Sequence, residues 1–116
     1  MQLFVEGKDL VDLDIFTVSD PMCTLKTRNS NKDYDPWILS GETEVIDNNL
    51  NPKWIQHFTV GYMFQKDIDL WFQVWNVSDD NESKKDLIGE ANVTLSEIMQ
   101  SKTQEVKLIL QLPTND

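Results

Sequence analysis

The chain has little of the two side chains on which many metal and nucleophile sites depend, with one cysteine and one histidine in 116 residues. A single cysteine, Cys23, excludes an internal disulfide and a zinc site built from cysteines. A nucleophilic pair of Cys23 and His57 would need both side chains within hydrogen-bond reach, yet strand alternation points them in different directions. Glycine-rich phosphate loops and metalloprotease motifs are also absent. We therefore expect a protein that is not an enzyme.

Basic side chains are also scarce, with 10 lysines and arginines against 20 aspartates and glutamates and a net charge of −10. Such a surface repels nucleic acid and bare anionic lipid unless local basic groups or a bridging cation intervene. We therefore expect no nucleic-acid partner. The sequence has no signal peptide and no apolar run long enough to span a bilayer, which favours a cytoplasmic location. The length predicts a single domain over residues 1–116.

What the chain does contain is a period-2 alternation of apolar and polar side chains, which is typical of half-buried antiparallel strands. Leu70, Phe72 and Val74 share one face of a segment whose other face carries Trp71 and Trp75. A second segment has its expected inward side chains at Leu87, Gly89, Ala91, Val93 and Leu95.

Seven segments of this kind can be recognised, separated by polar connections with turn residues. They lie near residues 2–6, 21–28, 37–46, 54–62, 69–77, 87–95 and 104–112. Only residues 96–100 have the pattern of a helical turn, which Ser96 is able to cap. This spacing predicts an all-β fold, an antiparallel sandwich of two sheets with one short helical turn.

Acidic and polar residues stand where several of these strands end. Asp14 and Asp20 bracket the first loop, Asn76 and Ser78 continue the inward face of a strand, and Asp86 begins the next one. If the loops after residues 6, 46 and 77 share one end of the sandwich, these side chains converge there. Carboxylates that converge need a cation, and calcium accepts about 6–8 oxygen ligands in irregular geometry. The alternative is that the aspartates only solvate loops or turn the chain.

Three blocks of the sequence resemble, in order, the signature blocks of C2 domains. They are residues 19–21 (SDP), residues 43–54 with the motif NLNPKW, and residues 86–90 (DLIGE). The block at residues 44–54 and the turn at residues 94–98 look most like the first C2 domain of copines. The resemblance implies an eight-stranded antiparallel sandwich, in which three loops at one end bind calcium and dock on phospholipid headgroups.

The resemblance also implies a set of calcium ligands, two aspartates from the first loop and three from the third. Asp14 and Asp20 match the first pair, and Asp86 matches the last of the third loop. The other two positions hold Asn76, which still offers an oxygen, and Ser78, which is a poor calcium ligand. We therefore expect at most one ion, bound more weakly than by five aspartates.

Four further residues match places where C2 domains touch membranes. Ile15 and Phe16 occupy the apolar tip of the first loop, and their burial in a bilayer could contribute a few kcal/mol at about 25 cal/mol per Å². Lys84 and Lys85 in the third loop could contact lipid phosphates or remain a solvated pair. The predicted function is a non-catalytic module that docks on anionic phospholipid with calcium and is recruited reversibly from the cytoplasm.

Two alternatives stay open from the sequence. Trp71 and Trp75 lie on the outer side of their strand, so a loop covers them or they form a contact patch of a calcium-independent protein-interaction module. The eighth strand implied by the resemblance would follow Asp116. Either the chain is a fragment of a larger multidomain protein, or a partner chain supplies that strand, or the sheet closes up.

Overall fold

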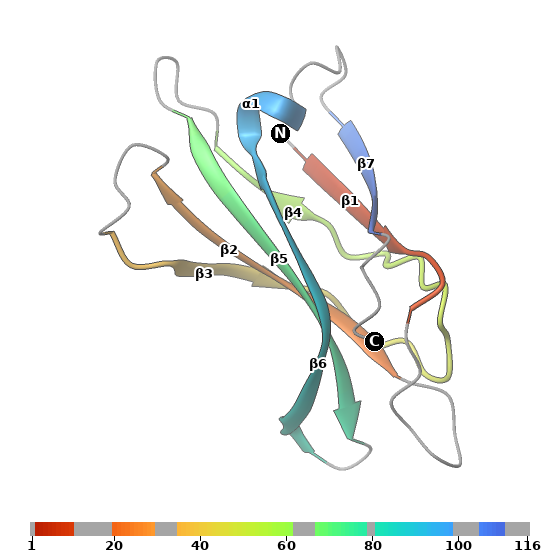
Figure 1. The fold of residues 1–116 in the computed structure, drawn as a ribbon. Coiled ribbons are helices and arrows are strands. Elements are labelled where there is room, and N and C mark those ends of the chain that lie inside the picture. Colours follow the sequence, from red (N-terminus) through yellow and green to blue (C-terminus); the bar gives the residue numbers. More distant parts are fainter. Residues whose placement is uncertain are drawn as a thin grey trace.

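The computed structural model describes residues 2–10, 20–29, 35–61, 67–78, 81–98 and 105–110. Its strands form two facing sheets (Figure 1). The three-stranded sheet has the order β4-β1-β7 and consists of β4 (Phe58–Thr59), β1 (Gln2–Gly7) and β7 (Glu105–Leu110). The four-stranded sheet has the order β3-β2-β5-β6 and consists of β3 (Ile38–Glu42), β2 (Pro21–Asn29), β5 (Ile68–Ser78) and β6 (Asn81–Thr94). The predicted two-sheet sandwich is confirmed.

The core lies between the two sheets and is built by strand alternation. Leu3 and Val5 face inward from β1, and they meet the inward side chains of β2 and β5. Phe58 of β4 packs edge-on against Phe72 of β5, with ring centroids 6.0 Å apart. Burying each large apolar side chain contributes roughly 1.5–3 kcal/mol, so this layer drives the association of the sheets.

Three strands differ clearly in length from the sequence prediction. The third covers only Ile38–Glu42, whereas a strand over residues 37–46 was expected. The fourth is reduced to Phe58–Thr59, whereas a strand over residues 54–62 was expected. The sixth begins at Asn81 rather than near residue 87, because the pairing of β5 with β6 continues from Asp69↔Thr94 to Ser78↔Asn81. Polar residues at this end were interpreted as a connection, but backbone ladder bonds need no apolar side chains.

The inward face of β6 is shifted by a bulge. The register moves between Val74 and Trp75, so that Val74 pairs with Gly89, Trp75 pairs with Leu87, and Ile88 is the extra residue. Ile88 is 5% exposed and belongs to the core, whereas Leu87 is 41% exposed on the outer face. The prediction that Leu87 faces inward was therefore wrong. One extra residue in a strand moves the side chains on one side of the bulge to the opposite face of the sheet.

The three-stranded sheet contains the one parallel pair of the described structure. All six residues of β1 pair with β7 in parallel, from Gln2↔Glu105 to Gly7↔Leu110. β7 thus satisfies the backbone hydrogen-bonding groups along that side of β1. This corresponds to the alternative in which the sheet closes up. Membership of a larger multidomain protein stays a prediction. The remaining strand pairs of the two described sheets are antiparallel.

The predicted helical turn is present as α1 (Leu95–Ile98), but Ser96 is not its cap. The Thr94 hydroxyl accepts a hydrogen bond from the Glu97 backbone N–H at 3.3 Å, and Glu97 Oε2 accepts one from Thr94 N–H at 3.4 Å. This is the reciprocal arrangement of a capping box. Ser96 instead donates its hydroxyl to Asp67 at 2.6 Å. Within the described residues, no helix has the length and apolar character needed to cross a bilayer.

Candidate functional site

Strand pairing brings Asp20, Asn76 and Asp86 to neighbouring positions at one end of the four-stranded sheet. Pro21 of β2 pairs with Asn76 of β5, and Asn76 pairs with Asp86 of β6. Residues paired in this way lie on the same face, so Asn76 and Asp86 continue the core face beyond the last apolar layer. Asp20 directly precedes Pro21 and joins them through the hydrogen bond from its backbone N–H to Asn76 Oδ1. We call Asp20, Asn76 and Asp86 the acidic row.

The carboxylate of Asp20 is largely withdrawn from water, with 7% of the residue exposed. Its Oδ1 accepts a hydrogen bond from the backbone N–H of Asn48 at 2.7 Å. Within the described residues no lysine or arginine forms an ion pair with it, since the ion pair found there joins Arg28 and Asp69. A buried carboxylate of this kind is costly unless a cation or further donors compensate it.

Asn76 serves as a clamp between β5 and the entry to β2. Its Oδ1 accepts a hydrogen bond from the backbone N–H of Asp20 at 2.9 Å, and the Asp20 carbonyl accepts one from Val77 N–H at 3.1 Å. Asn76 is 4% exposed, so this pairing is buried. An amide oxygen has two lone pairs. The hydrogen bond to Asp20 therefore does not by itself prevent the same oxygen from touching a cation.

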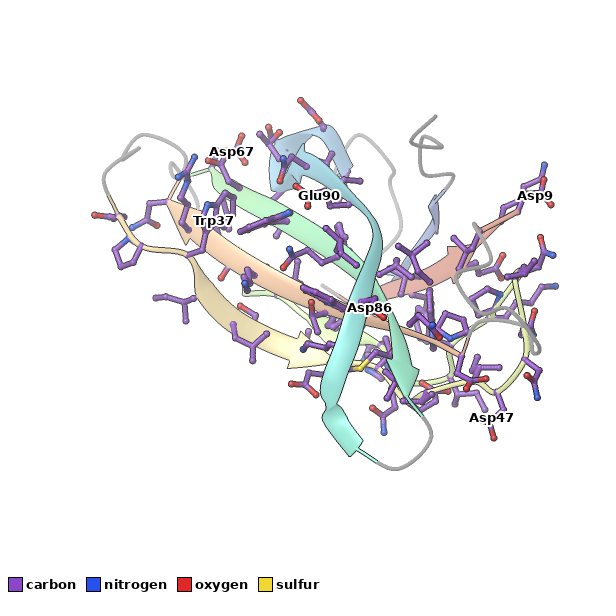
Figure 2. The ribbon with its side chains drawn as sticks, turned by 60° about the horizontal axis from the view of Figure 1, so that its bottom comes forward. Asp9, Trp37, Asp47, Asp67, Asp86 and Glu90 are labelled. Atoms are coloured by element: carbon purple, nitrogen blue, oxygen red, sulfur yellow. The ribbon has the colours of Figure 1, made fainter. Side chains whose placement is uncertain are left out.

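Asp86 differs from its two neighbours because it is exposed on the surface of β6 (Figure 2). The row thus combines one buried carboxylate, one buried amide and one solvated carboxylate. No group of three or more histidine, cysteine, aspartate or glutamate side chains suited to a metal ion occurs among the described residues. Asp14, the third predicted carboxylate, lies outside them.

The predicted membrane contacts are described only in part. Ile15 and Phe16 lie outside the described residues, as do the side chains of Ser78 and Lys84. Lys85 is described, and its Nζ lies 4.7 Å from the centroid of the Trp75 ring. That contact holds the ammonium group against the outer face of the four-stranded sheet.

The segment between β3 and β4 supports the acidic row, and strand patterns did not predict this role. Asn48 adopts a positive φ of 52°, a conformation that asparagine tolerates better than most residues, and its N–H points at Asp20. Glu44 accepts the backbone N–H groups of Ile55 at 2.7 Å and Gln56 at 3.1 Å. The polar residues of this segment signalled a turn, but not which carboxylate it would support.

The outer face of the same sheet carries the tryptophans that the sequence placed there. Trp71 packs on Trp37 with ring centroids 5.3 Å apart, and Lys26 Nζ lies 4.8 Å from the Trp71 ring. Neighbouring side chains therefore cover part of both Trp71 and Trp75. Trp71 Nε1 and Gln73 Oε1 are nevertheless buried without a hydrogen-bond partner in the described part of the chain.

Cys23 and His57 are far from forming a nucleophilic pair. Cys23 is fully buried in the core, where burial raises the pKa of its thiol far above the ordinary range. His57 is exposed and packs on the Phe4 ring at a centroid distance of 4.8 Å. The thiolate is the nucleophilic form of cysteine, so a thiol that stays protonated is not an activated nucleophile.

Comparison with known proteins agrees with this fold. The family model of the C2 domain matches residues 3–110. The chain is 36% identical to Copine-E of Dictyostelium discoideum over 91% of its own length, and 30% identical to Protein BONZAI 2 of Arabidopsis thaliana over 95%. It is also 26% identical, over 93% of its length, to Nicotinic receptor-associated protein 1 of Caenorhabditis elegans. The chain spans 18% to 20% of the length of these curated relatives.

Two solved structures have the same fold. A C2 domain of a plant Extended Synaptotagmin 1 superposes with a TM-score of 0.62 at 23% identity, covering 81% of this chain and 66% of the other. A structure described as BON1-C2B superposes with a TM-score of 0.58 at 24% identity, covering 80% and 62%.

Proposed function

Because the chain belongs to the C2 domain family, we propose that it is a membrane-targeting module that docks on anionic phospholipid in a calcium-dependent way. The docking end is the end of the four-stranded sheet that carries the acidic row, together with the loop that contains Asp14, Ile15 and Phe16. The ion is held by Asp14, Asp20 and Asp86 with the Asn76 oxygen, and one ion at most is bound. Ser78 contributes little, because a neutral hydroxyl is a weak calcium ligand.

The observation that carries this proposal is the buried, pre-positioned carboxylate of Asp20. It is 7% exposed, with its backbone joined to Asn76 by a 2.9 Å hydrogen bond and its Oδ1 bonded to Asn48 N–H at 2.7 Å. A ligand that is already oriented loses little conformational freedom when an ion arrives. A divalent cation next to it would also offset the cost of its burial.

The chain's charge supports a bridging role for the ion. A net charge of −10 repels an anionic membrane. Calcium between the acidic row and the lipid phosphates removes that repulsion locally and allows the apolar tip at Ile15 and Phe16 to enter the interface. The module would accordingly move between cytoplasm and membrane as calcium rises and falls, and it would have no catalytic step of its own.

Sedimentation with vesicles that contain phosphatidylserine tests this proposal. The protein should pellet with the vesicles in excess calcium and stay in solution with chelator. Asp86→Asn should weaken this binding at least about tenfold, since a charge-assisted contact contributes roughly 1.5–3 kcal/mol. The matched control is Glu90→Gln, which removes one exposed charge from the same strand on the opposite face.

Equal pelleting in calcium and in chelator would refute the calcium-dependent proposal. Equal losses for Asp86→Asn and Glu90→Gln would mean that overall charge, and not the acidic row, governs binding.

The second candidate function is a calcium-independent protein-interaction module. It is favoured by the outer face of the four-stranded sheet, where Trp71 and Trp75 remain partly exposed. Exposed aromatic surface of this kind can serve as a contact patch for a protein partner. Nicotinic receptor-associated protein 1, a relative, carries a name that speaks of association with a receptor. In this case Trp71→Ala abolishes capture of the partner, and vesicle binding is absent.

A further inference from the structure

A cavity of about 280 Å³ opens on the outer face of the four-stranded sheet, away from the acidic row. Its floor is a second row of paired residues, in which Arg28 of β2 pairs with Asp69 of β5 and Asp69 pairs with Thr94 of β6. Trp37 forms one wall. The volume falls just below the range of about 300–1,000 Å³ typical of drug-sized ligands. The cavity therefore suits one side chain rather than a cofactor.

The cation inside this cavity is already engaged. Arg28 Nε donates to Asp69 Oδ2 at 3.3 Å, and the guanidinium carbon lies 4.3 Å from the centroid of the Trp37 ring. Trp37 is itself held by packing on Trp71. Because Arg28 is paired with a carboxylate and with an aromatic face, its charge is not available to attract an anion.

The remaining charge in the cavity is negative. Arg28 and Asp69 neutralise each other, which leaves the exposed carboxylate of Glu97 at the rim. Within the described structure the Glu97 carboxylate makes only the long capping bond from Thr94 N–H, at 3.4 Å. Asn92 adds an exposed amide to the rim. The chain's net charge of −10 strengthens the preference of this site for a cation.

We infer that this cavity binds one lysine or arginine side chain of a basic segment in a protein partner. The charged head meets the Glu97 carboxylate, and the aliphatic stem lies along Thr94 and the Trp37 wall, all of which line the cavity. Long cationic side chains bury their stems in this way while the head stays polar.

The position of the cavity favours a protein over a lipid as the source of the cation. Pro21 and Arg28 are seven residues apart on β2, which is about 23 Å at roughly 3.3 Å per residue. Figure 2 shows Trp37 at one end of the four-stranded sheet and Asp47, near the acidic row, toward the other. If the acidic row faces the membrane, the cavity faces away from it, so this choice between protein and lipid rests on the proposed function.

An NMR titration of the whole chain tests the inference in chelator and without vesicles. The probes are three capped tripeptides with central arginine, lysine or glutamine, together with phosphocholine. The arginine and lysine peptides should shift the Trp37 indole N–H and the Asn92 amide signals in a saturable way, and the glutamine peptide should not. Equal shifts with the glutamine peptide, or tighter binding of phosphocholine than of either cationic peptide, would overturn the inference.

A pair of matched variants locates the binding. Glu97→Gln should weaken the arginine peptide about two- to fivefold, the factor expected from an exposed ion pair, while glutamine still supports the capping box. Glu90→Gln lies on the same outer face outside the cavity lining and should leave binding unchanged. Equal effects of the two variants contradict the assignment. Since calcium and lipid are absent, a failure of membrane docking leaves this result unaffected.

Discussion

The side-chain oxygen of Asn76 accepts the backbone N–H of Asp20 at 2.9 Å, so the residue that replaces an expected aspartate also holds the neighbouring aspartate in place. An aspartate at position 76 has the same shape and could accept the same hydrogen bond. The asparagine thus preserves the geometry of the acidic row while it removes one negative charge. In the absence of an ion, this lowers the repulsion between side chains that share one end of the sheet.

The first prediction concerns calcium affinity. Asn76→Asp combined with Ser78→Asp should tighten calcium binding at least about tenfold, because each change adds a charged oxygen ligand where the resemblance to C2 domains implies one. Isothermal titration calorimetry measures this directly. The control is Glu90→Asp, on the outer face of β6, which should leave the affinity unchanged. An unaltered affinity in the double variant would mean that positions 76 and 78 do not face the ion.

The second prediction concerns the segment that supports the acidic row. Glu44→Ala should lower the free energy of unfolding by about 1 kcal/mol, because the backbone N–H groups of Ile55 and Gln56 lose their shared acceptor. Urea denaturation measures the loss. Glu42→Ala, an exposed glutamate two residues earlier, is the matched control and should change stability by less than about 0.5 kcal/mol. Similar losses for both variants would deny Glu44 a special role.

The third prediction concerns the buried thiol. Burial raises the pKa of Cys23 in the folded state, so only the unfolded chain ionises at moderately alkaline pH. The stability contributed by the neutral thiol is complete below about pH 8.5, and it falls above that value by up to about 1.4 kcal/mol per pH unit.

Comparison with Cys23→Ala isolates this contribution, because the other titrating groups are shared. The native protein should also resist iodoacetamide at pH 8, except at the rate at which it unfolds. Labelling of the folded protein as fast as a free thiol would contradict the buried position of Cys23.

The fourth prediction concerns Asp67, which holds the start of α1 against β5. Partial burial raises the pKa of this carboxyl, but the hydrogen bonds from Ser96 and the backbone N–H of Ile68 outweigh it and hold the pKa below its ordinary value. Its contribution to stability is therefore present above about pH 4 and lost as the pH falls below that value. Thermal unfolding from pH 7 to pH 2.5 measures this.

The control for that experiment is Asp67→Asn, which should be less stable at pH 7 and should lose less stability on acidification. An identical acid response in the two proteins would show that Asp67 does not contribute to it.

The fold and the location of the acidic row could be predicted because both depend on local regularities. The alternation in β5 placed Leu70, Phe72 and Val74 inward and Trp71 and Trp75 outward, and the structure confirms it. Continuing that alternation by one step placed Asn76 on the core face, where the structure has it. A side-chain period of two residues extends as far as the strand does.

The bulge at Ile88 could not be predicted in the same way. Leu87 and Ile88 are both apolar, so either could have taken the inward position, and the choice depended on how β6 fits against Val74 and Trp75 of β5. Likewise Thr94 rather than Ser96 caps α1, because Asp67, 29 residues away in the sequence, takes the Ser96 hydroxyl. Both outcomes depend on residues that are distant in the chain.

The sequence by itself determined the two-sheet sandwich, the family and the set of acidic residues near the strand ends, since periodicity and motif order are local properties. Only the tertiary structure decided that Asp20 is buried against Asn48, that Asn76 clamps it, and that Arg28, Trp37 and Glu97 meet around one cavity. These contacts join separate strands and loops. They follow from strand register and packing, which no single stretch of sequence specifies.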